Sequence, residues 1–206
     1  MTSDYLVRGI SRSDDAAALQ SELHFLSDSG LVMGVFGSNA QVGEAQPRGL
    51  ELDPFLGFGW STEVDWRGHV RATYYSYPWN RAGSGYNYAE LHGDVVYRDL
   101  VQLAAVYSPD APRLVANRGL VGGASRSIEG NLQQRFYDKA SAIAGIGYSN
   151  LGGPAPGNYV YWSVGGAYEL RAVALTLSYV GTSGAKSLFY QEKTSQHLDA
   201  TIIYHF

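Results

Sequence analysis

Apolar and polar residues alternate along most of the chain, and a period of two is typical of β-strands whose two faces meet different surroundings. From Trp66 onward, for example, Val70 and Tyr74 share its parity, whereas Arg71 lies on the other parity. Helical periodicity is almost missing, because only residues 14–23 bring enough alanine and leucine together to suggest a helix. The pattern therefore predicts an all-β protein.

Counting the alternating segments predicts about twelve strands of roughly ten residues, the length that a tilted strand needs to cross a bilayer. The predicted connections alternate between short turns and longer loops, as in outer-membrane barrels. The short link at 12–15 is an exception, since it lies on the long-loop side. The predicted strands are residues 3–12, 16–27, 31–40, 50–60, 65–77, 86–98, 100–108, 125–137, 140–150, 158–169, 172–182 and 196–206. The longer predicted connections are Gln41–Gly49, Pro78–Gly85, Ser108–Ala124, Leu151–Gly157 and Ser183–Ser195.

Alternation alone does not decide which way the apolar face points. It points inward in a soluble barrel and outward in a membrane barrel. The aromatic residues favour the membrane barrel, because those on the apolar parity fall near the strand ends, at the heights of the two membrane interfaces. A soluble core has no reason to sort aromatic residues by height. The expected girdle residues are Phe25, Trp60, Trp66, Tyr97, Tyr107, Phe136, Tyr148, Tyr168, Tyr179 and Phe206.

These patterns predict a closed antiparallel transmembrane β-barrel with an up-and-down meander and a single domain over residues 1–206. Closure is expected because lipid offers no hydrogen-bond partner to an exposed strand edge. We expect the barrel to lie in the bacterial outer membrane, with the lipid bilayer as its partner. No signal peptide is visible, so we expect this numbering to describe the mature form.

The end of the chain carries a separate signal. Phe206 is terminal, and Tyr204 and Ile202 continue the alternation before it. Residues 198–206 are similar to the assembly signal of outer-membrane proteins, which makes the barrel-assembly machinery an expected partner. The alternative is an amphipathic last strand that ends in phenylalanine by chance.

Composition narrows the range of functions. The chain has 15 Lys and Arg against 19 Asp and Glu, a net charge of −4, whereas a nucleic-acid binder needs a basic surface. We therefore expect no nucleic-acid partner. The absence of cysteine excludes disulfide scaffolds and cysteine-based metal or thiol chemistry.

Charged residues concentrate on the polar parity, which faces the lumen of a closed barrel. Folding the hairpin of the fifth and sixth predicted strands places His69 opposite Asp94 and Arg71 opposite His92. One interpretation is a water-filled pore in which opposed arginine and carboxylate rows create a transverse field. The other is a salt-bridge network that fills a narrow barrel. The expected lumen-lining residues are Glu51, Asp53, Arg67, His69, Arg71, Glu90, His92, Asp94 and Arg135.

Inward tyrosines gather near the long-loop side of the predicted barrel. One interpretation is a constriction, or a stacking surface for sugar-like or aromatic solutes. The alternative is that tyrosine fills the lumen while its hydroxyl stays wetted. The constriction candidates are Tyr75, Tyr77, Tyr88, Tyr159 and Tyr161.

Catalytic and metal chemistry find little support in the sequence. His69 with Asp94 is the best acid–base pair, but no serine of known placement joins it. His197 and Asp199 share a face, yet their Cα atoms lie about 7 Å apart along a strand. We therefore expect no enzyme, no catalytic residue, no cofactor and no metal site, because no tight cluster of histidines and carboxylates is predicted.

Short motifs lie along most of the chain. They are Asp4-Tyr5-Leu6-Val7-Arg8-Gly9-Ile10-Ser11, Gly37-Ser38-Asn39, Glu51-Leu52-Asp53, Tyr75-Ser76-Tyr77-Pro78 and Tyr107-Ser108-Pro109-Asp110. Through these motifs the chain resembles a proteobacterial outer-membrane family, the TorF-type porins. Residues 109–124 and the strand after them match least. The resemblance implies an outer-membrane location and, more weakly, porin activity.

The leading functional hypothesis is an outer-membrane channel for passive diffusion of small polar solutes or ions. Selection would come from size exclusion together with the opposed arginine and carboxylate rows. One alternative is an outer-membrane hydrolase with its site on the barrel. Another is an occluded barrel that serves adhesion or envelope structure through its loops.

Overall fold

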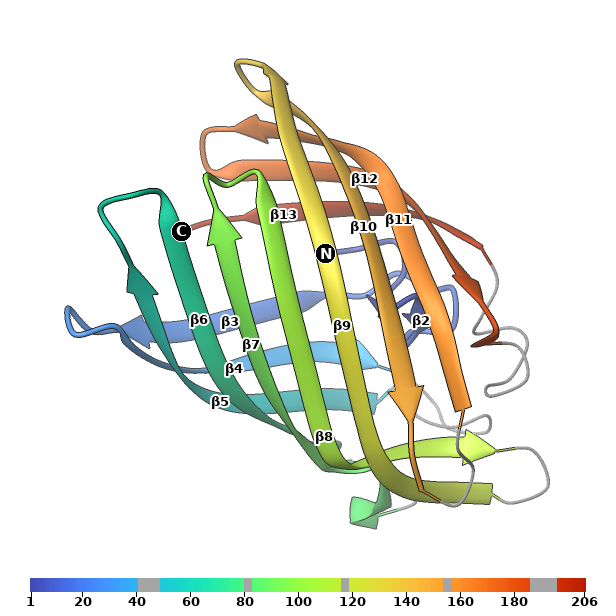
Figure 1. Cartoon of the computed structure of the whole chain (residues 1–206). Helices are drawn as coiled ribbons and strands as arrows, with labels where there is room; N and C mark the ends of the chain where they lie inside the picture. The colour runs from blue at the N-terminus through green and yellow to red at the C-terminus, as the bar shows by residue number, and fades with distance from the viewer. Residues whose placement is uncertain (41–48, 80–82, 116–118, 154–156, 186–195) are drawn as a thin grey trace.

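Within the residues that the structure describes, eleven strands follow one another in chain order in a single antiparallel sheet, so the predicted all-β meander is confirmed. Figure 1 shows this sheet curling round on itself. The computed structural model describes residues 1–40, 49–79, 83–115, 119–153, 157–185 and 196–206. The strands of the sheet are β3 (Gln20–Leu26), β4 (Leu31–Ala40), β5 (Gly49–Ser61), β6 (Trp66–Tyr75), β7 (Tyr88–Tyr97), β8 (Val101–Val115), β9 (Gly119–Tyr137), β10 (Ala140–Leu151), β11 (Gly157–Leu170), β12 (Val173–Ser183) and β13 (His197–Tyr204).

Each of these strands overlaps one predicted strand, but β8 and β9 are longer than predicted. The predicted connection Ser108–Ala124 is wrong, because the two strands continue through it as a hairpin. A register shift between Ser108 and Ala111 lets the hairpin bend there. The other predicted long connections include residues outside the described part of the chain.

Tight turns fix the register of the sheet at one end, which we call the short-turn end. After β7, Arg98 and Asp99 both have positive φ angles, 53° and 55°, as in the turns that suit the twist of antiparallel strands. The predicted pairing of His69 with Asp94 across β6 and β7 is confirmed. Because the side-chain period is two, this register places a whole set of polar side chains on one face.

The first predicted strand, residues 3–12, is wrong. The segment instead forms a small separate hairpin of β1 (Leu6–Val7) and β2 (Ile10–Ser11). The turn between them needs two residues with positive φ, and Arg8 and Gly9 provide them at 51° and 75°. A glycine at the second turn position costs no steric strain, so the chain reverses where alternation alone predicts a continuous strand.

Residues Met1–Ser3 connect the two edges of the sheet. Thr2 pairs with Thr201 of β13 on one side and with Ala18, just before β3, on the other. The Thr2 amide donates to the Ala18 carbonyl at 2.9 Å, and the Ile202 amide donates to the Met1 carbonyl at 2.8 Å. Backbone groups of β13 and of the chain just before β3 therefore find partners in these residues.

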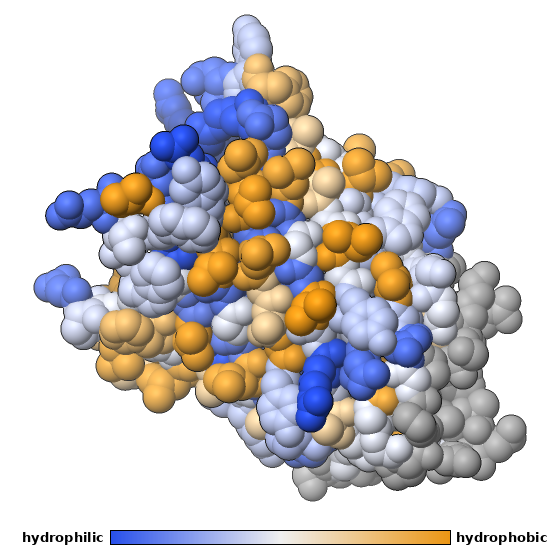
Figure 2. Space-filling model, in the orientation of Figure 1, coloured by the Kyte–Doolittle hydropathy of each residue, from blue (hydrophilic) through white to orange (hydrophobic). Residues whose placement is uncertain are grey.

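The distribution of burial is the reverse of that in a soluble protein. On the outer face, large apolar side chains such as Leu103 and Leu177 are 58% and 53% exposed, whereas Glu51 on the inner face is 1% exposed. Figure 2 shows apolar side chains spread over the middle of the visible outer surface, with hydrophilic ones toward its upper and lower ends. Within the described residues the one helical element is η1 (Gly83–Tyr86), and no helix is long and apolar enough to cross a bilayer.

Candidate functional site inside the curled sheet

Residues 4–16, which we call the inner segment, lie against the inner face of the sheet. Arg8 at the tip of its hairpin donates to both carboxylate oxygens of Glu90 on β7, at 2.9 and 2.7 Å. Gly9 approaches β12 so closely that a Cβ there would lie 2.6 Å from Thr182 Cγ2. These contacts reach strands on different sides of the curl, so the inner segment occupies the space between them.

The pKa of Arg8 reflects this pairing. Burial by itself lowers the pKa of the Arg8 guanidinium, but the hydrogen bonds to Glu90 and its negative charge outweigh burial and raise the pKa above its usual value. The charged form is therefore favoured, and the bidentate geometry is the strong form of an arginine–carboxylate pair. Glu90 itself is 5% exposed, so neither charge has much water to replace its partner.

Two further side chains of the inner segment bind the inner face of the sheet. The Tyr5 hydroxyl donates to Glu51 Oε1 at 2.8 Å, and Arg12 Nη2 donates to the Tyr88 hydroxyl at 3.2 Å. Burial first, and then the negative charge of Glu51, raise the pKa of Tyr5 well above its usual value. Tyr5 therefore stays a neutral donor, and the buried Glu51 carboxylate receives a hydrogen bond.

A polar cluster around Asp4 holds the base of the inner hairpin. The hydroxyls of Ser11 and Ser13 donate to Asp4 Oδ1 at 2.6 and 2.9 Å. The Nδ1 atom of His197 on β13 lies 3.1 Å from Asp4 Oδ2 and 2.8 Å from Asp15 Oδ1. This cluster fastens both ends of the hairpin to the last strand of the sheet.

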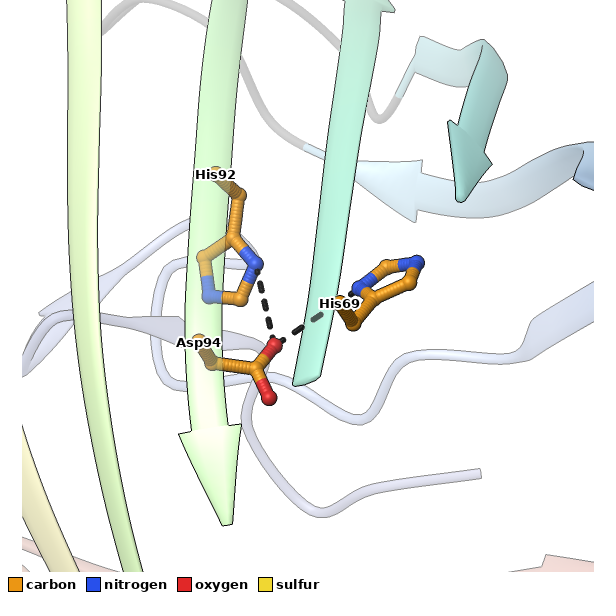
Figure 3. Close-up of side chains that lie close together, drawn as sticks. All are labelled: His69, His92 and Asp94. Atoms are coloured by element: carbon orange, nitrogen blue, oxygen red, sulfur yellow. Dashed lines mark ion pairs between the residues drawn. The ribbon is translucent and has the colours of Figure 1, made fainter. Parts of the chain in front are cut away.

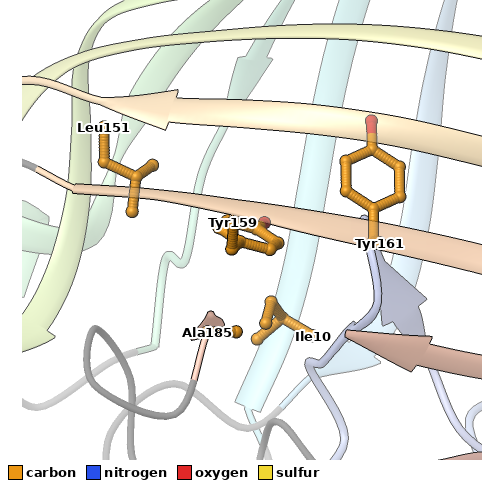
Figure 4. Packing of buried hydrophobic residues seen from close by; sticks show 5 residues of the cluster. All are labelled: Ile10, Leu151, Tyr159, Tyr161 and Ala185. Carbon is orange, nitrogen blue, oxygen red and sulfur yellow. The ribbon is translucent and has the colours of Figure 1, made fainter. Parts of the chain in front are cut away.

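Apolar and aromatic packing fills the remaining space around the inner segment. Ile10 packs with Tyr159 and Leu151, as Figure 4 shows. On the opposite side, the Tyr75 and Tyr88 rings stack with centroids 4.4 Å apart and 4° between their planes. The inner segment and these rings together fill the end of the interior away from the short turns, which we call the filled end. The predicted constriction residues Tyr77, Tyr88, Tyr159 and Tyr161 are all buried there, and Tyr75 is partly buried.

The predicted opposition of arginine and carboxylate rows is wrong for Glu51 and Asp53. The register of β5 and β6 pairs Gly57 with Arg71 and Leu52 with Ser76. The two carboxylates therefore lie toward the filled end, well away from Arg71. Their charged neighbours come from the inner segment, which the strand pattern could not supply.

The interior near the short turns, which we call the open end, is hollow. One cavity of about 580 Å³ is lined by Ser61, His69 and Asp94 among others, and one of about 340 Å³ by Gln102 and Gln133 among others. Arg67 and Arg135, predicted to line the lumen, lie at the rim of this end, each paired with an exposed carboxylate. Arg67 pairs with Asp99, and Arg135 with Glu169 at 3.2 Å.

His69, His92 and Asp94 gather between the two ends. The Nδ1 atoms of His69 and His92 lie 3.6 and 3.5 Å from the same atom, Asp94 Oδ1. Figure 3 shows both rings, one from β6 and one from β7, turned toward this carboxylate. The expectation that no tight histidine–carboxylate cluster forms is wrong. The signal was present, because the predicted pairing of His69 with Asp94 puts His92 on the adjacent diagonal.

Arg71 connects this cluster to β3. Its Nη1 atom lies 3.8 Å from Glu22 Oε2, and its guanidinium lies 4.8 Å from the Phe55 ring centroid. Glu22 in turn lies 3.1 Å from His24 Nδ1. These partly exposed side chains give the middle of the interior a mixed charge.

Of the ten predicted girdle residues, nine are exposed and one, Tyr97, is half-buried. Tyr97 is half-buried because its ring packs on Trp66, with centroids 4.8 Å apart. The other nine girdle residues are exposed: Phe25, Trp60, Trp66, Tyr107, Phe136, Tyr148, Tyr168, Tyr179 and Phe206.

The second candidate hydrolase pair, His197 and Asp199, does not come together. His197 faces Asp4, while Asp199 accepts a hydrogen bond from the Thr2 hydroxyl at 2.6 Å.

Comparisons with known proteins fit this architecture. The fold is similar to that of OmpF from Salmonella typhi, solved as a complex with daunomycin, with a TM-score of 0.51 and 12% sequence identity. The likeness covers 86% of this chain and 57% of the OmpF chain, so it supports a porin-like β-barrel fold and no shared activity. No curated protein matches the sequence. The TorF-type assignment stays a prediction. A family described as bacterial proteins of unknown function, Gcw_chp, matches residues 1–206, and the chain therefore belongs to the Gcw_chp family.

Proposed function

We propose that the chain is a porin-like channel of the bacterial outer membrane, through which small polar solutes or ions diffuse passively. The observation that carries the proposal is the inverted burial of the sheet. An outer surface of exposed apolar side chains suits acyl chains, and an inner surface of charged side chains suits water. A soluble barrel would need the opposite arrangement.

The contacts of Met1–Ser3 support a closed barrel. These residues hydrogen-bond to β13 and to the chain just before β3, so they bridge the two edges of the sheet. Within a bilayer an unpaired edge would expose backbone groups to hydrocarbon at a cost of several kcal/mol each. Bridging of this kind is therefore what a membrane-spanning sheet requires.

The interior gives the proposed channel two unequal parts. Solutes reach the open end through its cavities and pass the mixed charges around Arg71 and Asp94. Beyond them the inner segment narrows the route, so passage depends on the space left beside it. Size exclusion would then act at the filled end and charge selection in the middle.

A second candidate function is an occluded barrel that serves adhesion or envelope structure. The packing of the inner segment favours it, because Glu90, Tyr77 and Tyr88 are nearly inaccessible. Recordings from single barrels decide between the two, because an occluded barrel conducts no ions.

Planar-bilayer recording tests the channel directly. The purified full chain should give discrete conductance steps, and Arg71→Glu should shift the reversal potential toward cation selectivity, because it inverts a charge in the middle of the interior. Arg126→Glu is the matched control, since Arg126 is exposed beside the outward Tyr107 ring. A stable barrel that never conducts would refute the proposed channel, and an equal shift in both variants would refute charge selection at Arg71.

A further inference from the structure

Two imidazoles and one carboxylate meet on the inner face of the sheet, halfway between the open and filled ends. His69, His92 and Asp94 each offer one ligand atom, and these atoms all lie within 4.8 Å of one another. We propose that they form a binding site for a divalent transition-metal ion of the zinc type. Two histidines and a carboxylate are a common set of protein ligands for such ions.

The distances favour a metal over hydrogen bonds. Both imidazole nitrogens lie 3.5–3.6 Å from Asp94 Oδ1, which is too far for a good hydrogen bond. A tetrahedral zinc ion with bonds of about 2.0–2.1 Å holds its ligand atoms roughly 3.3 Å apart. The two distances to Asp94 Oδ1 are therefore close to the spacing that one ion requires, and the ligand atoms of the two histidines lie within 4.8 Å of each other, so side-chain rotations can complete the fit.

The group at His197 shows the contrast. Its Nδ1 atom lies 2.8 Å from Asp15 Oδ1 and 3.1 Å from Asp4 Oδ2, which are ordinary hydrogen-bond lengths. His197 itself is buried, and the group fastens the inner segment to β13. The same residue types thus form a structural contact in one place and a wider, more accessible cluster in the other.

The surroundings leave room for an ion and a fourth ligand. His69 and Asp94 line the cavity of about 580 Å³ at the open end, so water or a solute can reach the remaining coordination position. Gly57 on β5 makes space for the ring, because a Cβ there would lie 3.0 Å from His69 Nε2. Three protein ligands with an open fourth position are typical of exchangeable zinc sites.

Isothermal titration calorimetry of the full chain in detergent micelles, purified without a histidine tag, tests the site with Zn²⁺. We expect one saturable site per chain, and His69→Gln and His92→Gln should each weaken it by more than about tenfold. His24→Gln is the matched control, because His24 faces Glu22 alone and is more exposed than either ligand. Both ligand variants replace partly exposed side chains with a similar volume, so the barrel should still fold, which its strand circular dichroism checks.

The proposal fails if Zn²⁺ does not bind with saturation, or if the two ligand variants bind it as the unchanged chain does. An equal loss in the His24 variant would also overturn it, because binding would then reflect histidine content and not this cluster. The readout is metal binding, so the result does not depend on whether the barrel conducts ions.

Discussion

The two ends of the interior use the same kinds of residue in opposite ways. At the filled end Arg8 pairs with Glu90, and their side chains are 17% and 4% exposed. At the open end Arg67 pairs with Asp99, and theirs are 59% and 73% exposed. The difference comes from the inner segment, which excludes water from one end only. The burial of an ion pair, more than the identity of its residues, therefore decides how much the pair contributes to the free energy of unfolding.

The largest difference should come from removing one carboxylate from each ion pair. Glu90→Ala leaves the Arg8 charge buried without a partner, which should lower the free energy of unfolding by about 3–5 kcal/mol. Asp99→Asn removes the charge of an exposed partner and keeps a side chain that tolerates the positive φ of the turn, so it should cost under about 1 kcal/mol. Denaturant unfolding in detergent, followed by tryptophan fluorescence, measures both. Similar losses in the two variants would mean that the inner segment does not shield Glu90.

A smaller difference in stability should separate alanine variants of two glycines that have nearly the same φ angle. Gly9 and Gly119 have φ angles of 75° and 72°, so alanine at either position costs roughly 1–2 kcal/mol in backbone strain. A Cβ at Gly9 also meets Thr182 at 2.6 Å, whereas one at Gly119 meets nothing within 4 Å. Gly9→Ala should therefore cost about 1–3 kcal/mol more than Gly119→Ala in the same unfolding experiment. Equal costs would show that the inner segment is not pressed against β12.

The smallest difference concerns two hydrogen bonds between serines. At the filled end the Ser127 hydroxyl donates to Ser149 Oγ at 3.0 Å, and both are buried. At a short turn the Ser27 and Ser29 hydroxyls are 2.8 Å apart and exposed. Ser149→Ala should cost about 1 kcal/mol, because it leaves a buried hydroxyl unpaired, while Ser29→Ala should change stability by only about 0.2 kcal/mol, since water replaces the partner. A thermal melt of the two variants checks this, and a reversed order would contradict the assignment of the filled end.

Most of the sheet could be predicted from the sequence, because strand alternation and tight turns are local. The pairing of His69 with Asp94 follows from folding the predicted strands 65–77 and 86–98 against each other with a side-chain period of two, and it is correct in the structure. The orientation of the two faces was also accessible, since the charged parity is buried and the apolar parity exposed. Both features depend only on the register and the face orientation of neighbouring strands.

The inner segment could not be predicted in this way. Its hairpin signal is a single Arg8-Gly9 pair between Val7 and Ile10, and this short sequence also fits a continuous strand. Its partners, such as Glu90, are distant in sequence, so no local pattern connects them.

The few residues that join the first and last strands have a consequence for how the molecule is made. Met1–Ser3 are continuous with the hairpin that occupies the interior, with no spacer between them. In our proposal, the pairing of Met1–Ser3 with β13 closes the barrel and encloses the hairpin in the same step. We therefore expect closure of the proposed barrel and filling of its interior to be coupled in the assembly of this chain.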